Sequence, residues 1–355
     1  YMGGLAIGSR VAGWQMHRVK HPVWLYGVLE AGIALCAIAM PWGLLGVEHL
    51  QVQFFGGEAE PPAAGHPSQV IFGLASAFAL IVLPTAMMGA TLPLLAKHAV
   101  HSDRQVGPRI GVLYGIITYG AVAGTLAAAF VLLPRLGAEQ TTWVGAGINL
   151  AIFVLVCLVA RRHLESSGVE LEQESRDLQA EEVAQQSDAN NTRYRFILWF
   201  AAIAGAVAFC YEIVFTRILS HVLGGSVYAF ATMLAGLLLG IALGGTLAAR
   251  LAIRRDRSVT IFVYAQCFVG LCALFGYHMI DALAGWYEAD TDGPASRTSH
   301  VFVAMLILLP LSTCIGATFP LATRILARDE SDAATSAARV YFWNTVGGIG
   351  GALVT

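Results

Sequence analysis

The chain has 355 residues, of which 57% are hydrophobic and only 12% are charged. Soluble domains carry about 25% charged residues, so this composition excludes an ordinary soluble domain. The net charge of −2 gives no electrostatic reason to expect nucleic-acid binding. Apolar stretches of spanning length recur along the chain, since about 20 residues are enough to cross a bilayer. Because polar and apolar residues do not alternate as in a membrane β-barrel, we predict an all-α polytopic membrane protein.

Ten membrane segments are predicted, taken here in chain order. The complete spans lie near 23–46, 70–96, 109–133, 140–160, 196–220, 226–249, 258–284 and 299–323. Partial spans lie at 1–13 and 340–355. The opening residues, YMGGLAIGSRVAGW, are too few to cross a bilayer, so we expect the first helix of the bundle before Tyr1 and its last helix after Thr355.

Lysine and arginine residues collect on one side of these spans. That side holds 18 of the 21 basic residues, in the connections 10–22, 97–109, 161–195, 250–257 and 324–339. The connections on the opposite side, 47–69 and 285–298, instead carry acidic residues. Basic loops are retained in the cytoplasm, so we predict a multi-pass plasma-membrane protein with these basic connections inside.

A polar segment divides the chain into two helical halves. Residues 162–195 contain eight acidic residues and four arginines without a sustained apolar period, which is typical of a disordered or loosely helical linker. We predict a first helical repeat at 1–161 that lacks its first helix, an acidic cytoplasmic linker at 162–195, and a second helical repeat at 196–355 that lacks its last helix.

Short motifs recur in the two halves in the same order. GLAIGS at 4–9 returns as GIALGG at 240–245, which is 236 residues later, and GATLP at 89–93 returns as GATFP at 316–320, which is 227 residues later. Equivalent segments have the same orientation relative to the basic connections, so the repeats are parallel. Two parallel helical halves joined by a long cytoplasmic loop are the plan of major facilitator transporters. We therefore predict two repeats of about six helices each, truncated at both ends.

Glycines spaced by four residues recur inside the predicted spans. Such pairs place small residues on one helix face and let two backbones approach closely. We interpret them as packing positions, in the pairs Gly4 and Gly8, Gly120 and Gly124, Gly240 and Gly244, and Gly347 and Gly351. The stretch GGIGGA at 347–352 does not follow a strand, so it is not a dinucleotide-binding loop.

Four prolines lie inside predicted spans at matching places in the two halves, namely Pro84, Pro93, Pro310 and Pro320. A proline frees a backbone carbonyl and kinks or breaks a helix, and broken helices often form the binding sites of transporters. We interpret these prolines as structural kinks, and a binding role is the alternative.

The stretch FCYEIVFTRILSHV at 209–222 places charged residues in an otherwise apolar helix. Glu212 lies within the predicted membrane core, where a carboxyl has to be paired, protonated or in contact with water. Thr216 shares its helix face, Tyr211 precedes it, and Arg217 can reach the outer interface as an anchor. We expect an interhelical hydrogen bond or a functional site at Glu212.

Three further polar residues complete the candidate intramembrane site. Glu30 and Gln266 occupy equivalent positions of the two halves, so we expect them to face each other near the pseudo-symmetry axis. Asn344 has no polar counterpart in the first half. The cysteines all lie in apolar segments without histidines at ligand spacing, so we predict no metal site and no disulfide for Cys36, Cys157, Cys210, Cys267, Cys272 and Cys314.

Four segments together resemble one family, and they are YEIVFTR (211–217), GSVYAFATMLAGLLLGIALGG (225–245), LLPLSTCIGATFPL (308–321) and RVYFWNTVGGIGGAL (339–353). The family is that of fused major facilitator/spermidine-synthase-like membrane proteins of bacteria. The resemblance covers nearly the whole chain except the linker, and it implies location in the bacterial inner membrane. Phe215 stands where the family usually has tryptophan.

The resemblance also implies a soluble aminopropyltransferase-like domain with a Rossmann-type fold, which follows the membrane region. That domain would use decarboxylated S-adenosylmethionine and putrescine in polyamine biosynthesis. The 355 residues contain no GGGDG-type motif, so we expect no catalytic residue and no cofactor in this chain.

Three functions remain open from the sequence. The first is the membrane domain of a spermidine-synthase-like fusion, which holds or feeds a cytoplasmic enzyme. The second is a major-facilitator-like transporter of a small cationic or amine solute, with Glu212 and Glu30 as cation or proton partners. The third is a structural membrane scaffold without a ligand.

Overall fold

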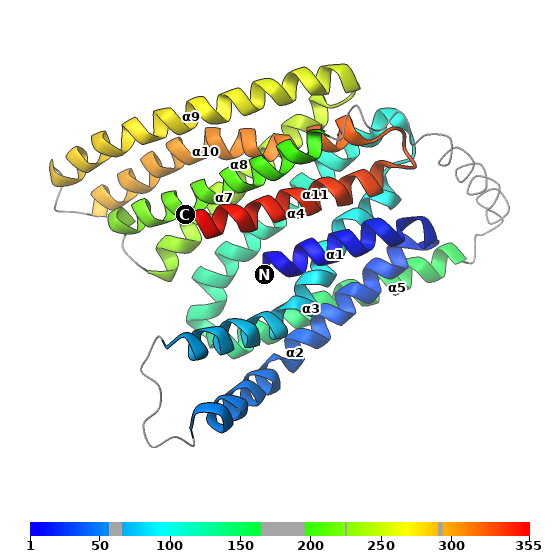
Figure 1. Ribbon diagram of the computed structural model, residues 1–355, viewed down its shortest axis with the longest axis horizontal. Helices are drawn as coiled ribbons and strands as arrows, with labels where there is room; N and C mark the ends of the chain where they lie inside the picture. The colour runs from blue at the N-terminus through cyan, green and yellow to red at the C-terminus, as the bar shows by residue number, and fades with distance from the viewer. Residues whose placement is uncertain (57–65, 165–195, 224–225, 290–293) are drawn as a thin grey trace.

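The computed structural model describes residues 1–56, 66–164, 196–223, 226–289 and 294–355, and this part of the chain is helical without a strand (Figure 1). The predicted linker at 162–195 lies outside the described residues from residue 165 onward. All ten predicted spans coincide with helices. Their bounds are α1 (Met2–Gln15), α2 (Pro22–Phe55), α3 (Pro67–Ala99), α4 (Val106–Ala127), α5 (Leu133–Leu164), α7 (Phe196–Leu223), α8 (Val227–Leu251), α9 (Arg255–Ala289), α10 (Pro294–Leu326) and α11 (Ala333–Val354).

Short irregular helices connect some of these elements. The 3₁₀ helices η1 (Met16–Arg18) and η2 (Asp103–Gln105) precede α2 and α4, and the π-helix η3 (Ala128–Leu132) joins α4 to α5. Within α5, Gly137 has a positive φ of 74°, a conformation that glycine adopts without steric cost. The helical path is therefore interrupted at Gly137, between the predicted spans 109–133 and 140–160.

Seven helical stretches in the described part of the chain are long and apolar enough to cross a membrane. They are Pro22–Phe55, Pro67–Ala99, Asp103–Ala160, Phe196–Arg217, Val227–Leu251, Arg255–Phe275 and Leu308–Leu326. These lengths and compositions are those of a multi-pass membrane protein, since about 20 apolar residues span the hydrocarbon core. Large apolar side chains on the surface, such as Leu35, Leu74 and Leu155, suit contact with lipid.

The helices pack in a defined order across the bundle. Helix α1 packs between α3 and α11, and α8 packs between α10 and α4. Helix α2 contacts α3 and α5, whereas α9 contacts α10 and α8. Figure 1 shows α2 and α9 at opposite edges, with α1, α4 and α11 between them.

The main buried core lies toward one end of the bundle. We call this end the basic end, and it carries the connections 16–21, 100–105, 252–254 and 327–332. Its fully buried side chains come from both halves of the chain and include Leu94, Ile110, Leu321, Ile325 and Val340. The two halves are therefore held together by apolar packing at the basic end.

The four intramembrane prolines do not break their helices. Helix α3 continues through Pro84 and Pro93, and α10 continues through Pro310 and Pro320. Hydroxyl groups close to the prolines bond to carbonyl oxygens of the preceding turn, as neighbouring groups do in membrane helices. Thr85 Oγ1 donates to the Ile81 carbonyl oxygen at 2.6 Å. The helices α3 and α10 are thus not broken at these prolines, and a binding role for the prolines stays a prediction.

Candidate functional site

Glu212 faces the helices of its own half. Together with Thr216 it lines a cavity of about 10 Å³, which is closed by Met233 and Leu237 of α8 and by Leu308 of α10. Within the described part of the chain, the Glu212 carboxyl has no hydrogen bond and no ion pair. A cavity of this volume has room for about one water molecule. The side chains of Glu212 and Thr216 therefore share one face, and the cavity that they line with the described residues has room for about one water molecule.

The residues on either side of Glu212 point elsewhere. Tyr211 packs against Phe215 with 6.2 Å between ring centroids and 40° between ring planes, and both belong to a small apolar cluster with Met233 and Leu311. The side chain of Arg217 is exposed toward the end of α7. Tyr211 and Arg217 are thus not part of the cavity that Glu212 lines.

Glu30 is buried inside the first half, with 8% of its surface exposed. Tyr26 lies one helical turn earlier and its side chain interacts with the Glu30 carboxyl. The same part of α2 packs closely against α5, because a Cβ on Gly27 would lie 2.8 Å from Val156 Cγ1. Glu30 is therefore enclosed where α2 packs against neighbours of its own half.

Gln266 occupies a different environment. It lines a largely apolar cavity of about 190 Å³ between α7, α9 and α10, together with Phe200, Val207 and Thr318. Because α2 and α9 lie at opposite edges of the bundle (Figure 1), Glu30 and Gln266 do not face each other. The expectation of a polar pair near the pseudo-symmetry axis is wrong, since each residue lies on an outer helix of its own half.

Asn344 and the nearby glycines join α11 to α7. Asn344 Nδ2 donates to the Ala201 carbonyl oxygen at 3.2 Å. A Cβ on Gly347 would overlap the Ala202 carbonyl oxygen, and a Cβ on Gly351 would overlap the next turn of α7. This close contact is the geometry expected of small residues between membrane helices, so Asn344 acts as a link between helices.

Other glycines of the predicted packing pairs behave differently from one another. A Cβ on Gly240 would meet the Ser312 side chain, and a Cβ on Gly244 would meet the Thr313 carbonyl oxygen. In contrast, nothing described lies within 4 Å of a Cβ placed on Gly120 or Gly124. The spacing of four residues therefore identifies a small face but not whether a helix covers it.

Two basic side chains at the ends of α3 and α10 bind the connections of the basic end. Lys97 Nζ donates to the carbonyl oxygens of Met16 at 2.8 Å and Val19 at 2.7 Å. Arg324 Nη2 forms an ion pair with Asp103 Oδ2 at 2.9 Å. These contacts tie the connections 16–21 and 100–105 to the helix ends.

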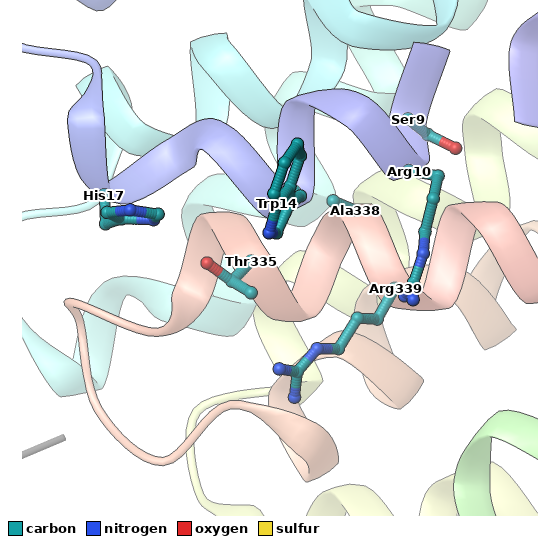
Figure 2. A pocket seen from close by; sticks show the side chains of 8 residues that line it. Ser9, Arg10, Trp14, His17, Thr335, Ala338 and Arg339 are labelled. Carbon is teal, nitrogen blue, oxygen red and sulfur yellow. The ribbon is translucent and has the colours of Figure 1, made fainter. Parts of the chain in front are cut away.

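A further cavity of about 340 Å³ opens at the basic end between α1 and α11 (Figure 2). Its polar lining comes from Arg10 and His17 on one side and from Thr335 and Arg339 on the other. Trp14 also contributes to the lining. No sequence pattern connects these residues, because they lie near the two ends of the chain and only the contact of α1 with α11 brings them together.

No group of three or more histidine, cysteine, aspartate or glutamate side chains comes together in the described residues, so these residues offer no evident metal site. No protein-family model matches the chain, and no curated protein matches it. Function is therefore inferred from the geometry and from the motifs of the sequence.

Proposed function

We propose that the chain is the integral membrane domain of a spermidine-synthase-like fusion protein and that it anchors the cytoplasmic enzyme. The two helical halves would be parallel repeats with a major-facilitator-like arrangement. Aminopropyl transfer from decarboxylated S-adenosylmethionine would belong to a soluble domain outside these residues. The observation that carries the choice of an anchor over a transporter is the small volume of the cavity beside Glu212, which has room for about one water molecule.

Contacts inside each half support the repeat. Gly4 approaches the Thr85 side chain in the first half, and Gly240 approaches Ser312 in the second. These residues are equivalent by the sequence offsets of 236 and 227. The hydroxyls also bond equivalently, because Ser312 Oγ donates to the Leu308 carbonyl oxygen at 2.6 Å, as Thr85 does to Ile81.

Contacts between the two halves are related by the same sequence offsets. A Cβ on Gly13 of α1 would lie 2.8 Å from Ala338 Cβ of α11, and a Cβ on Gly111 of α4 would lie 2.8 Å from Ala249 Cβ of α8. The offset of 236 takes Gly13 to Ala249, and the offset of 227 takes Gly111 to Ala338, so each pair is the equivalent of the other. Such reciprocal contacts are what a two-fold relation between parallel repeats produces.

Paired cysteines test this arrangement. The background is a chain without the six native cysteines. In it, Gly13→Cys with Ala338→Cys and Gly111→Cys with Ala249→Cys should both cross-link. The helices have to separate slightly in each case, because a disulfide needs about 3.8 Å between its Cβ atoms. Gly73→Cys with Gly350→Cys is the control, since nothing described lies within 4 Å of either position. Cross-linking of only one test pair would contradict the two-fold arrangement.

The proposed fusion to an enzyme is tested on the product of the whole gene. Spermidine formation from putrescine and decarboxylated S-adenosylmethionine should occur with the whole product and not with residues 1–355 alone. A coding sequence without a GGGDG-type soluble domain would overturn the fusion.

A transporter of a small cationic amine is the second candidate, and one observation favours it. Glu212 has no cationic partner among the described residues, and a carboxyl within the membrane requires a partner, a proton or water. A cationic solute would supply that partner in another conformation of the bundle.

Flux in proteoliposomes separates the two candidates. The anchor proposal expects no putrescine flux above protein-free vesicles. The transporter expects flux that Glu212→Gln abolishes and that Glu48→Gln, a matched change at an exposed acid, leaves intact.

A further inference from the structure

The cavity between α1 and α11 at the basic end has a strongly positive lining. Arg10 and Arg339 both line it, and no aspartate or glutamate does. Figure 2 shows Arg10 coming from α1 and Arg339 from α11, so the two arginines reach the cavity from its two helices. Two guanidinium groups that line one cavity repel each other, and an anion bound between them would offset this repulsion.

The protein itself leaves these two cations largely unneutralised. Arg10 lies over the Phe342 ring, with 5.6 Å between its Cζ and the ring centroid. Neither arginine forms an ion pair within the described ranges. Asp332 acts electrostatically on Arg339 without forming an ion pair with it, and the Asp332 carboxyl accepts hydrogen bonds from Ser336 Oγ and the Arg328 backbone N–H.

The remaining lining suits an anion with several acceptor oxygens. His17 and Thr335 add hydrogen-bond donors at the edge of the cavity. Trp14 is 70% exposed at the end of α1, and tryptophan at such a position marks the level of lipid headgroups. The volume of about 340 Å³ is within the range of small-molecule sites.

We propose that this cavity is a phosphate-binding site, in which Arg10 and Arg339 hold the phosphate oxygens from two helices. Guanidinium groups match phosphate geometry and donate paired charge-assisted hydrogen bonds. The phosphate could belong to the headgroup of an anionic phospholipid or to a soluble phosphate ester, because both present the same chemistry at this level of the membrane. The site is independent of whether the chain anchors an enzyme or transports an amine.

Ligand-dependent thermal stabilisation of the purified chain tests the site in two arms. A molecule that binds only the folded state raises the unfolding temperature with its concentration. The soluble arm compares sodium phosphate with sodium chloride at equal ionic strength, in detergent. The lipid arm compares nanodiscs of phosphatidylglycerol with nanodiscs of phosphatidylcholine. Stabilisation in either arm supports the site and identifies the source of the phosphate.

Three variants decide whether the cavity is responsible. Arg10→Gln and Arg339→Gln should each weaken the responding ligand at least tenfold. Arg257→Gln removes one exposed positive charge from the same end of the molecule and should change binding less than twofold. An equal loss in Arg257→Gln would mean nonspecific attraction and would overturn the proposal.

The proposal stays falsifiable if a glutamine variant fails to fold. Arg10→Lys and Arg339→Lys keep the positive charge but lose the planar fork of donors, so each should fold and bind the same ligand more weakly. Unchanged affinity in both lysine variants, or no stabilisation of the original chain in either arm, would overturn the site.

Discussion

Arg324 is a buried arginine, 5% exposed, that contacts two connections at the basic end. Its Nη2 donates to Asp103 Oδ2 at 2.9 Å, and its Nε donates to the Ile253 carbonyl oxygen at 3.5 Å. Asp103 is about half exposed, so water screens part of the attraction. The pair therefore matters chiefly because it gives a buried cation an acceptor.

Removing that acceptor should destabilise the folded chain. We expect Asp103→Ala to lower the free energy of unfolding by about 1 kcal/mol, the scale of one net hydrogen bond. Asp103→Asn should cost less than half as much, because its amide oxygen still accepts from Arg324. Scanning fluorimetry in detergent measures both, with Asp256→Ala at an exposed position of α9 as the control. Equal losses for the alanine and asparagine variants would contradict the role of the acceptor.

Asp332 precedes α11, outside the membrane segments, and the pKa of its carboxyl is shifted from the ordinary value. Burial is the largest influence and raises its pKa above the ordinary value of 3.8, although hydrogen bonds from Ser336 and Arg328 and the charge of Arg339 act in the opposite direction. A raised pKa means that the folded chain holds the proton more tightly than the unfolded chain does. Folding stability from this group is therefore lost as pH rises through the folded pKa, and is regained as pH falls.

The pH dependence of stability in the original chain and in the Asp332→Asn variant tests this direction. Between pH 7 and pH 4, the original chain should gain unfolding temperature relative to Asp332→Asn, because only the original carboxyl takes up a proton. Glu330→Gln changes an exposed acid nearby and should show no comparable trend. A loss of unfolding temperature by the original chain relative to Asp332→Asn as the pH falls would contradict the raised pKa.

At the scale of the helix, the same glycine spacing produces two outcomes. Gly347 of α11 is covered by α7, whereas nothing described lies within 4 Å of a Cβ on Gly120 of α4, its equivalent by the repeat offset. We expect Gly347→Ala to force α7 and α11 apart, because the new methyl group would overlap the Ala202 carbonyl oxygen. Gly120→Ala should be neutral or slightly stabilising, since alanine favours a helix by about 1 kcal/mol.

Size-exclusion profiles and unfolding temperatures of the two alanine variants in detergent check this contrast. The sharpest outcome is a lower unfolding temperature for Gly347→Ala alone. A similar loss for Gly120→Ala would mean that a helix also covers that face of α4.

These elements also indicate what sequence reasoning can reach. The spans were predictable because a helix in lipid must satisfy its backbone internally and needs a long apolar run. The neighbours of a polar group were not, because packing partners are far apart in the chain. Glu30 and Gln266 match in sequence yet lie on opposite outer helices. Arg10 and Arg339 form one cavity without any shared motif.

For the whole molecule, the number of crossings determines which side each connection faces. The apolar stretch Asp103–Ala160 contains 58 residues, and as one helix it would be about 87 Å long. The hydrocarbon core is about 30 Å thick, so one crossing cannot contain it. The interruption at Gly137 divides it into two crossings, α4 and α5.

This division can be read from the sides on which two serines lie. Ser68 lies at the start of α3, and Ser331 lies before α11. If α4 and α5 each cross the membrane, seven crossings separate the two serines. If Asp103–Ala160 crosses only once, six crossings separate them. In a chain without native cysteines, expressed in bacterial cells, an impermeant thiol reagent should label Ser68→Cys from outside and Ser331→Cys only after permeabilisation. An odd number of crossings and cytoplasmic basic connections together require this pattern. Labelling of both cysteines from the same side would mean that the number of crossings between them is even. Labelling of Ser331→Cys from outside and of Ser68→Cys only after permeabilisation would place the basic end outside.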